Sequence, residues 1–264
     1  MIPTAPLLAI IGMIAMTVAP TGLSAGEPAD QPDALTFSPP GDGKPLKYRF
    51  LAPPQVVAGN RYPLLVCLHG AGERGDDNGK QIGYFRPLFS GKHRTDFPAC
   101  VIIPQVPQGH LWATYGWGTK TKAMAETPSP TLALVKALID ELVAKQPIDA
   151  DRLYITGGSM GGYGTWETIQ RWPTLFAAAV PICGGGEVSR AKDLVHLPVW
   201  AFHGDKDNVI AADNTQRMIA ALEAAGGTPK FSLYPGVGHN SWDKAYGEPA
   251  LLPWLFAQKR SKAP

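Results

Sequence analysis

A serine flanked by glycines, Ser159, constrains the fold of this chain more than any other feature. It is the centre of the sequence GGSMG at residues 157–161, which directly follows the apolar run 153–156 and precedes a stretch compatible with a helix. This context is typical of a sharp strand-to-helix turn that presents a serine hydroxyl, and the strained turn needs small residues such as Gly157 and Gly161. We therefore expect Ser159 to be a nucleophile; the alternative is a serine that only caps the helix.

Two further apolar runs end in residues that suit the partners of a serine nucleophile. Residues 198–202 lead into HGDKD at 203–207, and residues 230–234 lead into a loop that ends in histidine. A serine hydroxyl needs an imidazole to take its proton and a carboxylate to orient that imidazole. We expect Asp207 to be the acid and His239 to be the base, in the chain order serine, aspartate, histidine.

The remaining acidic and histidine candidates have simpler interpretations. Asp205 is the alternative acid, but an aspartate just after a strand is often a turn former that accepts backbone N–H groups, so Asp207 is preferred. His239 differs from the other histidines because a glycine precedes it and polar residues follow it, as in a loop. His69 and His203 each end a strand before a glycine, and we expect them to support loop geometry.

An earlier strand is expected to supply part of an oxyanion hole. The continuous apolar run 64–68 predicts a strand buried on both faces, and it opens into HGAGERG at 69–75. An oxyanion hole combines a backbone N–H just after the nucleophile with one from such a loop. We expect these to be the N–H groups of Met160 and Ala71.

Four segments carry a resemblance to a known family: HGAGERG at 69–75, GSMGGYGTW at 158–166, PICGGG at 181–186 and HGDKD at 203–207. The chain resembles a bacterial esterase of the α/β-hydrolase superfamily. The group in question includes prolyl-oligopeptidase-like predicted peptidases, phospholipase/carboxylesterases and polyhydroxybutyrate-depolymerase-like enzymes. The resemblance runs from about residue 45 to the C-terminus and implies that Asp207 is the acid, but it is not specific for the substrate.

Strand-like and helix-like patterns alternate along the rest of the chain. This predicts an α/β-hydrolase fold, a doubly wound and mostly parallel sheet with helices on both faces and no separate lid domain. Ser129 followed by Pro130 is expected to cap a helix. Further strands are expected at residues 99–103 and 176–182, and helices at 130–145, 211–225 and 251–259.

The N-terminal region predicts export. An uncharged, mostly apolar stretch at 5–19 is followed by small residues, which is typical of a signal peptide cleaved after Ala25. No lysine or arginine precedes the stretch, so a retained anchor is the alternative. We divide the chain into a signal peptide (1–25), a disordered lead-in (26–44) and a catalytic domain (45–264). This division predicts a secreted or periplasmic protein without stable membrane insertion.

Charge and cysteine content narrow the function classes. The net charge of +2, with both signs interspersed, does not indicate nucleic-acid binding. Cys67, Cys100 and Cys183 lie in or beside apolar strand patterns, where a free cysteine behaves as a small hydrophobe; one disulfide with a spare thiol is the alternative. The histidines and cysteines lack metal-ligand spacing, so we expect no metal and no other cofactor.

Aromatic and polar residues near the expected catalytic edge indicate the substrate. Trp242 follows His239 by three residues, Trp112 lies in the aromatic loop 105–127, and Gln105 follows a strand. We expect these three side chains to contact a small-molecule or polymer-borne ester with a short or aromatic acyl group. The alternatives are a tryptophan that only fills a gap beside the sheet, a serine peptidase of prolyl-oligopeptidase-like type, and a non-catalytic polymer- or carbohydrate-binding module. The sequence does not indicate an oligomeric state.

Overall fold

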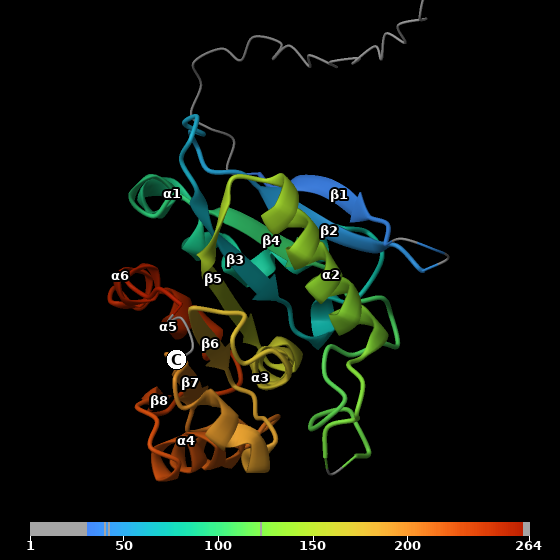
Figure 1. The fold of residues 1–264 in the computed structure, drawn as a ribbon. Coiled ribbons are helices and arrows are strands. Elements are labelled where there is room, and N and C mark those ends of the chain that lie inside the picture. The colour runs from blue at the N-terminus through green and yellow to red at the C-terminus, as the bar shows by residue number, and fades with distance from the viewer. Residues whose placement is uncertain (1–30, 40, 42, 122, 261–264) are drawn as a thin grey trace, which may run out of the picture.

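One eight-stranded sheet forms the centre of the protein (Figure 1). The computed structural model describes residues 31–39, 41, 43–121 and 123–260. Its strands lie in the order β1-β2-β4-β3-β5-β6-β7-β8; β2 is antiparallel to both neighbours, and β3 to β8 are parallel. The predicted doubly wound, mostly parallel sheet is therefore confirmed. The strands are β1 (Asp33–Phe37), β2 (Leu46–Leu51), β3 (Tyr62–Leu68), β4 (Cys100–Pro104), β5 (Ile148–Gly158), β6 (Ala178–Ile182), β7 (Trp200–Gly204) and β8 (Lys230–Tyr234).

Helical layers cover both faces of the sheet. Successive side chains of a strand point to opposite faces, so the apolar side chains of one strand contribute to both layers. On β3, Leu64 and Val66 belong to one buried cluster, and Leu65 and Cys67 belong to the other. This double burial explains why the central strands are apolar along their whole length. The first cluster includes residues of α2 (Pro130–Lys145), α3 (Met160–Arg171), η3 (Val188–Leu194) and α4 (Asp213–Ala224), and the second includes η2 (Lys80–Leu88), α5 (Trp242–Tyr246) and α6 (Leu251–Phe256).

The helix α2, the longest among the described residues, begins where the sequence predicts. The Ser129 side chain accepts a hydrogen bond from the Leu132 N–H at 3.1 Å, and Pro130 takes the first helical position, where a missing N–H costs nothing. The apolar stripe of α2 is buried against the sheet. The two later helices are shorter than the sequence patterns indicate. Helix α4 ends at Ala224 and α6 ends at Phe256, before the predicted ends at residues 225 and 259.

Residues 33–37 correct the predicted disordered lead-in. They form β1, which pairs with β2 from Asp33 opposite Phe50 to Phe37 opposite Leu46. The proline- and aspartate-rich composition of residues 26–44 hid the short segment DALTF, which extends the sheet and buries Phe37. The predicted signal peptide, residues 1–25, lies outside the described residues. Across the ranges that the structure describes, no helix is long and apolar enough to cross a membrane.

The three cysteines are free and buried. Burial raises the pKa of the Cys67 thiol well above its usual value and that of Cys100 to about 11. These two thiols are therefore protonated and pack as small apolar side chains, as the sequence pattern predicts.

Candidate active site

The turn between β5 and α3 holds Ser159 in a strained backbone conformation, with φ 58° and ψ −120°. Residues other than glycine rarely adopt positive φ values, and such strain is concentrated at functional sites. A Cβ atom on Gly157 would lie 2.5 Å from the Leu68 carbonyl oxygen, and one on Gly161 would lie 1.7 Å from it. Only glycine allows this close approach, which sets Ser159 at the carboxyl end of β5.

Three loops bring Ser159, His239 and Asp207 together. The Nε2 atom of His239 lies 2.8 Å from Ser159 Oγ, and the Nδ1 atom of His239 lies 2.8 Å from Asp207 Oδ2. Asp207 follows β7 and His239 follows β8, so all three side chains come from the carboxyl ends of parallel strands. An imidazole between a hydroxyl and a carboxylate is able to take the hydroxyl proton while the carboxylate orients the ring.

The Asp207 side chain is fully buried, yet each of its oxygens accepts hydrogen bonds. Oδ1 accepts the N–H groups of Val209 and Ile210, each at 2.9 Å. Burial raises the pKa of Asp207, but the hydrogen bonds from His239 and from the two backbone N–H groups outweigh it, and the net pKa lies below the usual value. The carboxylate is therefore ionised in the place where it contacts His239.

Asp205 occupies a different environment. Its side chain is exposed, and Oδ1 accepts the Gly236 N–H at 2.7 Å. This bond joins the turn after β7 to the turn after β8. The geometry thus brings Asp207, and not Asp205, to His239.

The two expected oxyanion donors begin helical segments. Met160 is the first residue of α3, and Ala71 is the first residue of η1 (Ala71–Glu73). The first N–H groups of a helix have no partner within it, so these positions suit an anion. Arg74 Nε donates a hydrogen bond to the Ala71 carbonyl at 2.9 Å and holds the loop in shape.

His69 supports the same loop from inside the protein. Its Nε2 accepts the Val106 N–H at 3.0 Å, so Nδ1 carries the hydrogen and donates to the Gly70 carbonyl at 2.6 Å. Burial lowers the pKa of His69 to about 4, which keeps the ring neutral at physiological pH. The sequence predicts that His69 supports the geometry of its loop, and these contacts agree with that role.

Two expected substrate contacts lie inside the protein instead. Trp112 is fully buried, and its Nε1 donates to the His69 carbonyl at 2.8 Å. Gln105 is 1% exposed; its Oε1 accepts the Asn78 N–H at 2.7 Å, and its Nε2 donates to the Glu73 carbonyl at 3.0 Å. Because their polar atoms already hold the surrounding loops together, Trp112 and Gln105 are structural residues in this arrangement.

Trp242 lies directly beside the candidate base. Its ring is 5.3 Å from the His239 ring in an edge contact, and it stacks on Tyr84 with the ring centroids 5.1 Å apart. A Cβ atom on Gly158 would lie 3.1 Å from the indole, so Trp242 also packs against the residue before Ser159. Sequence reasoning missed Tyr84, because it lies in η2, well removed from every strand end that served as a signal.

Cys183 connects the two segments that carry Ser159 and His239. It follows β6 with a positive φ of 38°, and its thiol accepts the Ser159 N–H at 3.3 Å and donates to the His239 carbonyl at 3.5 Å. Burial raises the pKa of Cys183 to about 12, so the thiol keeps the hydrogen that it donates. The sequence pattern predicted a buried hydrophobe at Cys183 and no contact with the catalytic residues; its place directly after a strand end was the available signal.

The same residues do not suit a metal ion. Ligand atoms of Cys183, Asp207 and His239 lie within 4.8 Å of one another. Metal binding requires a thiolate and a free imidazole nitrogen. The two ring nitrogens of His239 already contact Asp207 and Ser159, so neither is free for a metal ion. This donor set favours proton transfer over coordination.

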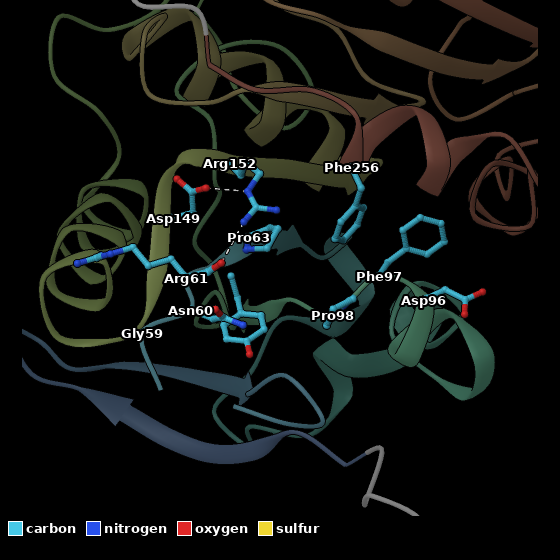
Figure 2. Close-up of a pocket in the computed structure, with 11 residues that line it drawn as sticks. Gly59, Asn60, Arg61, Pro63, Asp96, Phe97, Pro98, Asp149, Arg152 and Phe256 are labelled. Atoms are coloured by element: carbon cyan, nitrogen blue, oxygen red, sulfur yellow. Dashed lines mark hydrogen bonds and ion pairs between the residues drawn. The ribbon is translucent and has the colours of Figure 1, made fainter. Parts of the chain in front are cut away.

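A hollow of about 660 Å³ lies at the opposite edge of the sheet (Figure 2). Its lining comes from residues at or just before the amino ends of β3, β4 and β5 and from Phe256 of α6, and it contains no serine, cysteine or histidine. Its arginines are already engaged: Arg152 Nε donates to Asp149 at 2.7 Å, and Arg61 Nη1 donates to the Ile148 carbonyl at 3.0 Å. We therefore place the candidate active site at Ser159 and not in this hollow.

Comparison with known proteins identifies the family of this chain. Residues 101–246 match the dienelactone hydrolase family, and this range includes Ser159, Asp207 and His239. The chain belongs to the dienelactone hydrolase family. A solved thermostable esterase is similar to this family member, with 37% sequence identity and a TM-score of 0.81 over 88% of this chain and 64% of that chain. The α/β-hydrolase fold predicted from the sequence is thereby confirmed.

Two curated proteins are also similar to this dienelactone hydrolase family member. An uncharacterized secreted protein of Arthroderma benhamiae is 26% identical over 247 residues, which is 77% of this chain and 24% of that protein. A probable SOBER1-like carboxylesterase of Arabidopsis thaliana is 26% identical over 189 residues, which is 67% of this chain and 72% of that protein. The chain thus spans about a quarter of the first protein and most of the second.

Proposed function

We propose that this protein is a serine esterase that hydrolyses carboxylic esters through an acyl-enzyme. The observation that carries the proposal is the continuous contact from Ser159 through His239 to Asp207, with 2.8 Å at each step. The similarity to a thermostable esterase and to a probable carboxylesterase supports an ester as the substrate.

Acylation begins when Ser159 Oγ attacks the ester carbonyl carbon and His239 Nε2 takes the hydroxyl proton. The carbonyl oxygen becomes an oxyanion, and the N–H groups of Met160 and Ala71 donate hydrogen bonds to it. The imidazolium then gives its proton to the alkoxy oxygen, the carbon–oxygen bond breaks, and the alcohol leaves. Asp207 remains ionised throughout and stabilises the imidazolium.

Deacylation repeats these steps with water as the nucleophile. His239 takes a proton from the water molecule, whose oxygen attacks the acyl carbon on Ser159. The same N–H groups stabilise the second oxyanion. Collapse of this intermediate returns the proton to Ser159 Oγ and releases the carboxylic acid, so the cycle uses no cofactor.

The substrates that we propose are esters with short-chain or aromatic acyl groups. Trp242 offers a flat apolar surface beside His239, and flat or short groups lose little rotational freedom when they bind such a surface. A long alkyl chain loses more freedom for the same contact. Since Trp112 lies in the core, Trp242 is the residue that we place beside the acyl group.

We also propose that the protein is exported. The apolar stretch at residues 5–19 and the small residues before Ala25 support a cleaved leader. The similarity to a secreted protein of Arthroderma benhamiae supports the same localisation. Expression of the full chain with N-terminal sequencing of the released product tests this point, and we expect Gly26 as its first residue.

A fluorophosphonate probe tests the nucleophile directly. We expect wild-type protein to be labelled at Ser159 and to hydrolyse 4-nitrophenyl acetate, whereas Ser159→Ala protein of the same fold does neither. A folded wild-type protein that is neither labelled nor active would instead support a non-catalytic binding module. Hydrolysis of peptide substrates in preference to esters would move the assignment to a serine peptidase.

A further inference from the structure

Asp207 contacts a second imidazole besides His239. His203, on β7, places its Nε2 atom 3.2 Å from Asp207 Oδ2, and both side chains are fully buried. The same oxygen lies 2.8 Å from His239 Nδ1. Two histidines therefore share one carboxylate oxygen, although the proposed proton transfers use only His239.

The hydrogen-bond partners of His203 fix which nitrogen carries a hydrogen. Its Nε2 also lies 2.9 Å from the Ile210 carbonyl oxygen. Carbonyl and carboxylate oxygens only accept hydrogen bonds, so Nε2 carries the hydrogen. Its Nδ1 lies 2.7 Å from Thr215 Oγ1. The Nε2–H group is therefore held by the Ile210 carbonyl, and the same nitrogen also lies within 3.2 Å of Asp207 Oδ2.

Building on the proposed esterase function, we propose that His203 is a positioning residue for the acid. Its Nε2–H fixes Oδ2 of Asp207 at the place where the Nδ1–H of His239 meets it. Three hydrogen bonds, from His239 and the two backbone N–H groups, hold the carboxylate, and the Nε2 atom of His203 adds a fourth contact at 3.2 Å. Each donor draws negative charge toward itself, so His203 also limits how strongly Asp207 stabilises protonated His239.

Neutral groups surround this pair on the other elements. Tyr163 of α3 and Cys183 after β6 lie near Asp207, and burial raises the pKa of each to about 12, so neither is charged at neutral pH. Burial lowers the pKa of His203 more than the Ile210 carbonyl and the Asp207 carboxylate raise it, which favours the neutral ring. On the exposed side of α4, Arg217 pairs with Asp213 at 2.8 Å.

His203→Asn and His203→Gln form a matched pair of variants. A glutamine amide nitrogen reaches the place of Nε2 and is able to donate to Asp207, whereas an asparagine amide reaches only the place of Nδ1. We expect His203→Asn to lower kcat by about 10- to 100-fold, the loss seen when a group that orients a metal-binding histidine is removed, with little change in KM. We expect the acidic limb of the pH profile of kcat/KM to lie at higher pH in His203→Asn than in wild-type protein, because Asp207 then stabilises protonated His239 more strongly. His203→Gln should keep most of the activity and the wild-type limb.

The results for these variants distinguish the proposed role of His203 from the proposed esterase function. If wild-type protein is labelled by the fluorophosphonate probe and His203→Asn keeps the wild-type pH profile, the esterase proposal stands and the role of His203 is refuted. An equal loss in His203→Gln also refutes it, since that result indicates packing alone. Wild-type protein that is not labelled refutes both proposals.

A measurement on wild-type protein covers the case in which the asparagine variant does not fold. Histidine labelled with ¹⁵N reports which ring nitrogen carries the hydrogen, and His203→Gln identifies the resonances of His203. We expect a protonated Nε2 with a slowly exchanging hydrogen. A bare Nε2 on His203 would overturn the proposal, because no donor would then face Asp207.

Discussion

Replacing Asp207 with asparagine should reverse the tautomer of His239. The structure fixes the orientation of the new amide, because the N–H groups of Val209 and Ile210 both donate to Oδ1 at 2.9 Å. The amide oxygen takes that place, and the amide NH₂ takes the place of Oδ2, opposite His239 Nδ1. Since an NH₂ group only donates, Nδ1 must lose its hydrogen and Nε2 must gain one. The base then presents a hydrogen to Ser159 and is unable to accept one.

The alternative orientation of the amide is much less stable. Turning it over would break two backbone hydrogen bonds, each worth about 1 kcal/mol net, and would set the amide NH₂ against both N–H groups. The wrong tautomer at a serine, histidine and aspartate relay lowers kcat by about 10⁴-fold. At about 1.4 kcal/mol for each factor of ten, this loss corresponds to about 5.5 kcal/mol of transition-state stabilisation.

Hydrolysis of 4-nitrophenyl acetate by Asp207→Asn and by Asp205→Asn tests this reasoning. Asp205 accepts only the Gly236 N–H, and an asparagine oxygen is able to accept that bond as well, so we expect less than about a twofold change in the control. Thermal unfolding of both variants establishes that they are folded. A loss of less than tenfold in Asp207→Asn, or a larger loss in Asp205→Asn, would refute the assignment of the acid.

Three further predictions concern the pair Ser159 and His239, the buried His69, and Trp242. Ser159→Ala and His239→Ala should each lower kcat/KM by at least about 10³-fold without changing the melting temperature, and near wild-type turnover in either folded variant would exclude that residue from catalysis. The pKa of His69, about 4 in the folded chain, lies below the value of about 6.5 in the unfolded chain, so the unfolded chain binds the proton first as pH falls. The free energy of unfolding should then fall by up to about 1.4 kcal/mol per pH unit between pH 6.5 and 4; urea denaturation should show a flatter slope in His69→Gln, and an unchanged slope would contradict this cause. Trp242→Ala should weaken the preference for acetate, butyrate and hydroxycinnamate esters over palmitate esters, and a wild-type optimum at chains of about twelve carbons or more would contradict the role of the indole.

The sequence predicted the central fold well because its signals are local. Strands buried on both faces read as continuous apolar runs, as at 64–68, and the start of α2 is encoded by Ser129 and Pro130. The sequence analysis missed β1 because neither β1 nor its partner β2 is a continuous apolar run. Local patterns carry no information about such an edge strand until its partner is known.

The candidate site was predictable to the extent that its residues follow strand ends. Ser159, Asp207 and His239 each lie in a turn or loop that follows a strand of the parallel sheet, and the structure brings them within hydrogen-bond distance. Burial is what the sequence does not encode, and it explains why Trp112 and Gln105 are internal. The contact of His203 with Asp207 depends on side-chain directions across one loop, which spacing alone does not reveal.

The Cys183 thiol is hydrogen-bonded both to the Ser159 N–H and to the His239 carbonyl. It can therefore serve as a spectroscopic reporter of the turn that holds Ser159. The S–H stretching vibration absorbs in a spectral window that is nearly free of other protein bands, and its frequency falls as the hydrogen bond from the thiol becomes stronger. Cys183 remains protonated because burial raises its pKa to about 12, and its hydrogen points to the His239 carbonyl. An infrared difference spectrum between wild-type protein and Cys183→Ala would therefore record, without any added label, how the two segments move relative to each other during turnover.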